Sequence, residues 1–190
     1  MLQAIAENFG TTRGVVRLAL SYLEVASGLD NQSRIPLTKA KRLVFVCHGN
    51  ICRSAYADVI ARNLGLEVAS FGLSTETGKG AHPPVIEEAA RRGVDLSRHL
   101  TTAKEDFIPK EGDYFLAMET RHLRRMSMDP ALKGSAMALL GTYAKPPFPH
   151  LHDPYKLAPE YLPKCLDRIE IAVRAIAGRI SIPMIFEGDK

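Results

Sequence analysis

Residues 42–54 read RLVFVCHGNICRS, and they decide the fold of this chain of 190 residues. The first six form an almost continuous apolar run, which is typical of a strand that is buried on both faces of a sheet. Helical periodicity follows over residues 54–64, where apolar side chains recur on one side. The stretch is therefore predicted to form a buried strand, a tight loop and a helix in direct succession.

Strand and helix patterns alternate through the rest of the chain. Further strands are predicted at residues 68–71, 113–118 and 135–140, and further helices at residues 84–92, 119–126 and 159–180. Such alternation predicts a parallel sheet with helices on both faces, and right-handed crossovers bring the carboxyl ends of the strands to one edge. We therefore expect an α/β domain over residues 41–190, with four parallel strands and a ligand site at that edge.

Residues 1–40 are predicted to form an N-terminal helical extension and a linker. Residues 11–27 have a broad apolar face, Thr11 or Thr12 can cap the helix, and Gly28 can end it. Glycine, proline and polar residues gather after it and mark a boundary. We expect the helix to pack on the domain body or on a second copy of the chain, so a homodimer through this helix is one hypothesis.

The composition narrows the class of protein. Apolar residues make up 46% and charged residues 24% of the chain, as in globular domains. The net charge of +4 suits an anionic substrate, but it is too small and too dispersed to indicate nucleic acid. The most apolar stretch, residues 15–26, contains two charges and is too short to span a bilayer. The three cysteines show no C-x-x-C spacing, which argues against a disulfide framework or a zinc site and favours the cytoplasm.

The loop between the first strand and its helix combines groups that bind and attack phosphate. Gly49 and Asn50 tolerate positive φ, so successive backbone N–H groups can point inward around an anion. The helix that begins near Ser54 adds its positive end, and the guanidinium of Arg53 can bind two phosphate oxygens at once. Cys47 lies beneath these donors and is expected to attack phosphorus as a thiolate, which the Ser54 hydroxyl stabilises. The spacing C-x5-R-S is weak alone, but the strand before it and the helix after it make it specific.

This loop resembles the signature V-C-x-G-N-x-C-R-S of the low molecular weight protein tyrosine phosphatase family. The resemblance runs from about residue 41 to about residue 180. It includes Asp153-Pro154-Tyr155, which is similar to the family's D-P-Y loop, and the LAM stretch at residues 116–118. It implies a three-layer, flavodoxin-like fold and a phosphatase of phosphotyrosine proteins. The enzyme would form a phosphocysteine and need no metal and no other cofactor.

The resemblance also implies roles for individual residues. Asp153 would protonate the leaving oxygen and then activate water, two tasks that a phosphoenzyme mechanism requires in any case. The implied substrate-binding residues are His48, Gly49, Asn50, Ile51, Cys52 and Tyr155. Asn50, Ser54, Ser70 and His99 match the positions that hold the phosphate loop in shape. The closeness of Cys52 to Cys47 implies a reversible, protective disulfide.

Departures from the family pattern keep other functions open. The short segment from Phe71 to Pro83 supplies no aromatic ring at the place where some family members pack one against the phosphotyrosine, and His48 stands where an apolar residue is usual. The same fold hosts thiol-dependent arsenate reductases, which need later cysteines where this chain has only Cys165. A non-catalytic phosphate-binding module is the other alternative. The pair His150 and His152 has poor geometry for a metal site, so no metal is expected.

Overall fold

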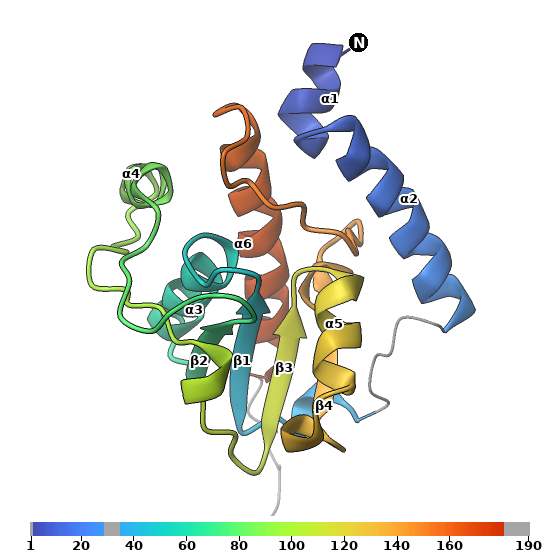
Figure 1. Cartoon of the computed structure of the whole chain (residues 1–190), viewed down its shortest axis with the longest axis vertical. Helices are drawn as coiled ribbons and strands as arrows, with labels where there is room; N and C mark the ends of the chain where they lie inside the picture. Colours follow the sequence, from blue (N-terminus) through green and yellow to red (C-terminus); the bar gives the residue numbers. More distant parts are fainter. Residues whose placement is uncertain (1, 29–34, 181–190) are drawn as a thin grey trace, which may run out of the picture.

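The computed structural model describes residues 2–28 and 35–180, and its centre is one sheet of four parallel strands (Figure 1). The strands are β1 (Arg42–Cys47), β2 (Val68–Gly72), β3 (Asp113–Ala117) and β4 (Ala136–Leu139), in the order β2-β1-β3-β4. Cys47 pairs with Gly72 and Val46 with Ala117, so the carboxyl ends of the three neighbouring strands lie at one edge. This confirms the predicted parallel sheet.

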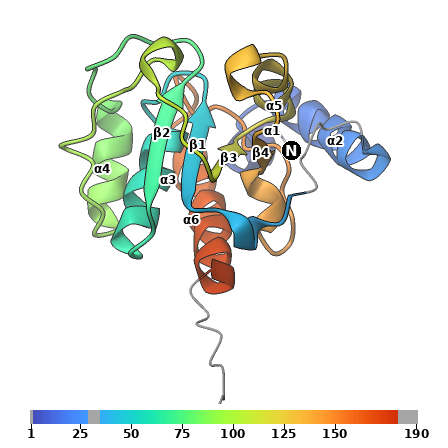
Figure 2. The ribbon, with the colours of Figure 1, turned by 90° about the horizontal axis from the view of Figure 1, so that it is seen from below.

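Helices cover both faces of the sheet, as the sequence predicted. They are α3 (Arg53–Asn63), α4 (Pro83–Arg91), α5 (Thr120–Ser127) and α6 (Tyr161–Ile180), with short 3-10 turns η1 (Leu37–Lys39), η2 (Lys104–Asp106), η3 (Pro130–Leu132) and η4 (Leu140–Tyr143). Along β1, Leu43, Phe45 and Cys47 enter the core beneath α3 and α6. Val44 and Val46 point to the opposite core, which α5 covers (Figure 2). Burial on both faces explains the unbroken apolar run of this strand.

The N-terminal extension forms two helices, α1 (Leu2–Phe9) and α2 (Thr12–Ser27). The ends of α2 are as predicted: the Thr11 hydroxyl accepts a hydrogen bond from the Gly14 N–H, and Gly28 closes the helix at φ +72°. The sequence pattern did not predict α1, whose eight residues make little more than two turns. Both helices pack on the body of the same chain, and the homodimer stays a prediction. Within the described residues, no helix is long and apolar enough to cross a membrane.

Two segments meet at the carboxyl edge of the sheet. The loop of residues 48–52 connects β1 to α3. The second, which we call the acid segment, comprises residues 145–160 between η4 and α6. The Leu151 N–H donates to the Met118 carbonyl, and the Met118 N–H donates to the carbonyl of Val46 on β1. These bonds hold the acid segment beside the loop of residues 48–52, so the candidate site lies between the two segments.

Candidate active site

The thiol of Cys47 lies at the end of β1 and receives two hydrogen-bond partners. Its Sγ lies 3.0 Å from the Ser54 Oγ, and the backbone N–H of Asn50 donates to it at 3.2 Å. Cys47 is 2% exposed and Ser54 is fully buried. A thiolate here would accept a hydrogen bond from each of the two partners. The structure thus brings together the sulfur and the hydroxyl that the sequence paired.

Asn50 holds the shape of the loop. Its φ of +53° is one that asparagine tolerates better than most residues. Its Nδ2 donates to the Ser54 Oγ at 2.9 Å and to the Ser70 Oγ at 3.1 Å, while its Oδ1 accepts from the Thr102 N–H at 2.9 Å. The His99 Nε2 donates to the Asn50 carbonyl at 2.7 Å. Burial lowers the pKa of His99, so the neutral ring carries its proton on Nε2.

The loop frame bears on three residues that the resemblance assigned. Ser70 and His99 lie behind the loop and contact Asn50. Asn50 had been assigned to substrate binding as well as to loop shape, but its side chain is fully buried and lines no part of the cavity at the thiol. Only its backbone N–H reaches the sulfur. Thr102, which completes the frame, was not predicted.

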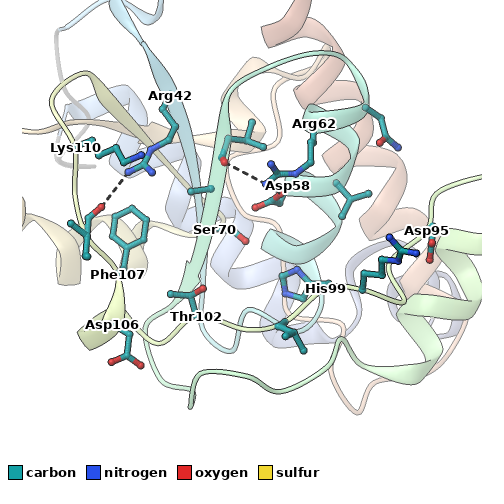
Figure 3. Close-up of a pocket in the computed structure, with 17 residues that line it drawn as sticks. Arg42, Asp58, Arg62, Ser70, Asp95, His99, Thr102, Asp106, Phe107 and Lys110 are labelled. Atoms are coloured by element: carbon teal, nitrogen blue, oxygen red, sulfur yellow. Dashed lines mark hydrogen bonds and ion pairs between the residues drawn. The ribbon is translucent and has the colours of Figure 1, made fainter.

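A cavity of about 760 Å³ lies behind this frame (Figure 3). Ser70, His99 and Thr102 line it, together with charged side chains such as Arg62 and Lys110. No residue from 47 to 54 contributes to its wall. This cavity is larger than the one at the thiol, but neither Cys47 nor Arg53 lines it.

Gly72, at the end of β2, lets the loop approach the sheet closely. A Cβ at this position would lie 2.9 Å from the Gly49 carbonyl carbon and 3.0 Å from the Asn50 nitrogen. Real Cβ atoms essentially never come within 3.0 Å of another heavy atom, so a side chain here would displace the loop. Gly49 itself does not adopt a positive φ. Of the two loop residues expected to tolerate that conformation, only Asn50 uses it.

Arg53 is buried between two carboxylates. Its Nη1 donates to the Glu119 Oε1 at 2.6 Å and to the Leu151 carbonyl at 2.8 Å, and its Nη2 lies 2.6 Å from the Asp153 Oδ2. Burial acts to lower the pKa of Arg53, but the charges of Asp153 and Glu119 outweigh it and raise the pKa above the usual value. The buried Nε has no partner among the described residues. One donor of the fork therefore remains free for a ligand.

Glu119 is the main residue of the site that the sequence did not reveal. It stands at the N-cap position of α5, although its side chain makes no capping hydrogen bond, and it is 3% exposed. Its Oε2 lies 2.7 Å from the Arg121 Nε. Burial acts to raise the pKa of Glu119, but the charge of Arg53 outweighs it and holds the pKa well below its usual range. An acidic residue two positions past the end of β3, at the ligand edge, is the signal that could have found it.

Two buried histidines flank the Glu119 carboxylate. The His122 Nε2 lies 3.7 Å from its Oε1, and the His150 Nδ1 lies 3.8 Å from its Oε2. Burial lowers the pKa of His122 to about 3 and that of His150 to about 4. Both rings are therefore neutral at pH 7. The charge of Glu119 is balanced by Arg53 and Arg121 and not by these histidines.

Asp153 and Tyr155 form the outer part of the site. The Asp153 side chain is 29% exposed, and its Oδ1 accepts a hydrogen bond from the Tyr155 N–H at 3.2 Å. The Tyr155 ring packs edge-on against His82, with 5.0 Å between ring centroids. A turn of this kind holds the carboxylate beside Arg53 while leaving one side open to solvent.

A cavity of about 290 Å³ connects these groups. Its walls include Cys47, His48, Gly49, Ile51, Cys52, Arg53, Asp153 and Tyr155, all of which the sequence singled out. Three further residues line it that the sequence did not indicate, Ser74, Thr75 and Lys79. The Cys47 thiol, the Arg53 guanidinium and the Asp153 carboxylate thus line one cavity.

The cysteines and histidines bear on two other features raised by the sequence, a disulfide and a metal site. All three cysteines are free, and burial raises the pKa of Cys52 well above its usual range. The disulfide between Cys47 and Cys52 stays a prediction. Among residues 2–28 and 35–180, no group of three or more His, Cys, Asp or Glu side chains is arranged to hold a metal ion. His150 and His152 instead contact each other, with 3.2 Å between Nε2 and Nδ1.

Comparison with known proteins identifies the family. The family model for low molecular weight phosphotyrosine protein phosphatase matches residues 42–182. The low molecular weight protein-tyrosine-phosphatase Wzb of Escherichia coli K12 is 36% identical over 98 residues, which are 50% of this chain and 67% of that protein. The low molecular weight phosphotyrosine protein phosphatase of Schizosaccharomyces pombe is 35% identical over 135 residues, 63% of this chain and 83% of that protein.

The fold agrees with this assignment. The crystal structure of the tyrosine phosphatase Wzb from Escherichia coli K30 in complex with sulphate covers 74% of this chain and 99% of its own, with a TM-score of 0.67 and 24% identity. Its similarity at this level concerns the fold, while the family model and the sequence relatives identify the family. The chain belongs to the low molecular weight phosphotyrosine protein phosphatase family.

Proposed function

We propose that this chain hydrolyses the phosphate monoester of phosphotyrosine in proteins, through a phosphocysteine formed at Cys47. The observation that carries the proposal is the Cys47 Sγ, 3.0 Å from one hydroxyl and 3.2 Å from one backbone N–H. It shares a cavity with the buried fork of Arg53. Preorganised donors of this kind supply the largest share of the rate in many enzymes.

In the first step the phosphate ester displaces one ion pair. Two of its oxygens bind the free Nε of Arg53 and the Nη2 that now contacts Asp153. The Cys47 thiolate attacks phosphorus, so an S–P bond forms while the bond from phosphorus to the leaving oxygen breaks. The leaving oxygen keeps the electron pair of that bond and takes a proton from Asp153. Glu119 keeps Arg53 in place throughout, because it binds the other nitrogen, Nη1.

In the second step water releases phosphate. Asp153, now ionised, accepts a proton from water as the water oxygen bonds to phosphorus. The S–P bond breaks and its electron pair returns to Cys47. The leaving thiolate is stabilised by the hydrogen bonds from the Ser54 hydroxyl and the Asn50 N–H. The cycle needs no cofactor.

The walls of the cavity support a phosphotyrosine substrate. The Tyr155 ring, held by His82, offers an aromatic wall against which a phenol ring can pack. Lys79 and His48 line the same cavity and suit acidic residues of a phosphorylated protein. The aliphatic phosphoserine lacks a ring for this wall. We place the reaction in the cytoplasm, since three free thiols fit a reducing compartment.

The two alternatives make different demands on the structure. A thiol-dependent arsenate reductase would pass a disulfide to a further cysteine, but Cys165 is fully buried within α6 and burial raises its pKa to about 12. A phosphate-binding module would have no use for Asp153 beside the guanidinium. Neither alternative is supported by a specific contact.

The test compares two cysteine variants on p-nitrophenyl phosphate. Cys47→Ser should abolish turnover while inorganic phosphate still binds, and Cys165→Ala should keep turnover, because its thiol does not line the cavity. Phosphotyrosine and phosphoserine peptides of equal sequence then test the substrate class. Turnover that survives in Cys47→Ser would refute the phosphocysteine, and equal rates on the two peptides would refute the preference for phosphotyrosine.

A further inference from the structure

The N-terminal extension lies outside the part of the chain that the family model matches, and it packs against the acid segment (Figure 1). The Asn8 carbonyl accepts a hydrogen bond from the Arg168 Nη1 of α6 at 2.6 Å. The guanidinium of Arg168 also lies 3.7 Å from the centre of the Phe148 ring. Near the other end of α2, the Tyr22 hydroxyl donates to the Pro147 carbonyl at 2.5 Å. These contacts attach α1 and α2 to the segment that carries Asp153.

The corner between α1 and α2 meets the acid segment at His152. Gly10, at φ +76°, forms the corner, and a Cβ here would lie 2.7 Å from the Leu157 Cδ1 and 3.0 Å from the His152 Cδ2. A Cβ at Gly14 would lie 3.3 Å from the same imidazole and would collide with the Phe9 carbonyl. Both positions admit glycine alone without displacement of a neighbour. The corner therefore packs directly on the imidazole of His152.

A chain of hydrogen bonds begins at this contact. The Thr11 Oγ1 accepts from the Gly14 N–H at 3.0 Å and lies 3.1 Å from the His152 Nε2. The Thr11 hydroxyl carries one hydrogen and a second lone pair, so it either donates to the His152 Nε2 or accepts from it, according to the tautomer of the ring. Burial lowers the pKa of His152, which keeps the ring neutral.

The contacts continue from His152 towards Arg53. The His152 Nδ1 lies 3.2 Å from the His150 Nε2, so one of these two nitrogens donates a hydrogen bond to the other. The His150 Nδ1 lies 3.8 Å from the Glu119 Oε2, which is too long for a hydrogen bond, and the other oxygen of Glu119 binds Arg53. The hydrogen bonds therefore end at His150, whose ring lies beside the carboxylate that holds Arg53.

We propose that the extension positions the proton donor of the active site in cis, through the contact of Thr11 with His152. His152 is a positioning residue: it directly precedes Asp153, its carbonyl accepts from the Tyr161 hydroxyl at 3.2 Å, and its ring is held between Thr11 and His150. With the ring fixed, the backbone of the next residue is fixed as well. The inference rests on the proposed role of Asp153 as the acid.

A misplaced acid has a kinetic signature that lost stability does not share. Phenyl phosphate, whose leaving group is poor, depends on protonation far more than p-nitrophenyl phosphate, whose leaving group is good. The ratio of kcat/KM for these two esters therefore reports the position of Asp153. A role of Thr11 limited to capping α2 would lower the melting temperature and leave this ratio unchanged.

The experiment uses full-length variants of the two contacting residues. Thr11→Val removes the hydroxyl at nearly constant volume, and His152→Asn keeps an amide near the Nδ1 position but loses the Nε2 side that meets Thr11. Each should lower the kcat/KM for phenyl phosphate about three- to tenfold, the rate equivalent of one hydrogen bond, and that for p-nitrophenyl phosphate less than about twofold. The double variant should be no slower than either single variant, because both remove one contact.

Two controls separate this contact from the rest of the extension. Thr11→Ser keeps the hydroxyl and should keep the ratio. Glu24→Gln breaks the ion pair between Glu24 of α2 and Arg124, whose atoms are 3.1 Å apart and which does not involve the acid segment. This variant should also keep the ratio of kcat/KM for the two esters. His152→Asn leaves the cap of α2 intact and carries the test alone if Thr11→Val does not fold.

The outcomes distinguish this inference from the proposed function. Absence of turnover in the unmodified chain would refute the phosphatase reaction itself. Normal turnover with an unchanged ratio in folded Thr11→Val and His152→Asn would overturn the positioning role and leave the reaction standing. Additive losses in the double variant would likewise overturn it, since the two side chains would then act separately.

Discussion

Replacement of Asp153 by asparagine should slow the reaction and yet tighten the binding of inorganic phosphate. The Asp153 carboxylate forms an ion pair with Arg53, with 2.6 Å between Oδ2 and Nη2. A phosphate that binds the guanidinium fork has to displace it. Asparagine keeps the size of the side chain but removes the charge, so the ion pair that competes with phosphate is weakened. The same change removes the proton donor.

The magnitude follows from the exposure of this pair. A hydrogen bond to a charged group contributes about 1.5–3 kcal/mol when buried, whereas an exposed ion pair contributes about 0–1 kcal/mol. The Asp153 side chain is 29% exposed and that of Arg53 is 1% exposed, which places the pair between these limits, at about 1–2 kcal/mol. The inhibition constant of phosphate should therefore fall about 5- to 30-fold. Loss of the acid should lower kcat/KM for aryl esters by about 10²–10⁴.

The assay is competitive inhibition of p-nitrophenyl phosphate hydrolysis by inorganic phosphate. Glu111→Gln is the matched control: it removes one negative charge from a side chain that is 94% exposed and precedes β3, at the opposite end of the sheet. Its inhibition constant should equal that of the unmodified chain. An inhibition constant in Asp153→Asn that is unchanged or higher would refute the competition between Asp153 and phosphate for Arg53.

Three further perturbations test the site and its support. Glu119→Gln should destabilise the fold by about 3–5 kcal/mol, because it leaves a buried guanidinium without its main partner, and should also lower kcat/KM. Asp113→Asn is the control: it breaks the buried ion pair with Arg42, far from the thiol, and should lower the melting temperature without a change in kcat/KM. A normal kcat/KM in folded Glu119→Gln would contradict the role of Glu119. Gly72→Ala should displace the loop and cost about 10²-fold in kcat/KM, so full activity in this variant would exclude the close approach. The free energy of unfolding, followed by denaturant titration, should fall as the pH drops from 6.5 towards about 4. In this range the two histidines bind protons in the unfolded chain but not in the folded chain, because folding lowers the pKa of His122 to about 3 and that of His150 to about 4. A free energy of unfolding that does not change with pH would contradict neutral buried rings.

Local sequence patterns were enough to predict the sheet and the nucleophile loop. The apolar run of β1, the glycine and asparagine after it, and the periodicity of α3 are all contained within 23 consecutive residues, 42–64, and the boundaries found differ by at most one residue. The strand β4 was predicted one residue too long at each end. Leu140 begins the 3-10 turn η4, and the Ser135 N–H donates to the Leu132 carbonyl within the turn that precedes the strand. Such errors do not move the site.

Contacts between distant segments could not be derived in this way. Ser70 and His99 were assigned through the family resemblance alone, and Thr102 was missed, because nothing near these residues in sequence shows that Asn50 requires partners. Glu119 resembles an ordinary helix cap until Arg53 is seen against it, 66 positions away. The extension likewise shows an apolar helix in sequence but not the surface that it covers. The sequence pattern predicts helices and strands, whereas ion pairs such as that of Arg53 with Glu119 can be found only in the tertiary structure.

The arrangement around Arg53 has a consequence for the protons of the reaction. The two arginines, Arg53 and Arg121, and the two carboxylates, Glu119 and Asp153, already sum to zero net charge. An incoming dianion therefore adds two negative charges to a cluster that is already neutral. Because the proposed mechanism has Asp153 donate a proton to the leaving oxygen, formation of the reactive complex should take one proton from the buffer. The enthalpy of association measured by calorimetry would then vary with the ionisation enthalpy of the buffer, and acidification would tighten binding.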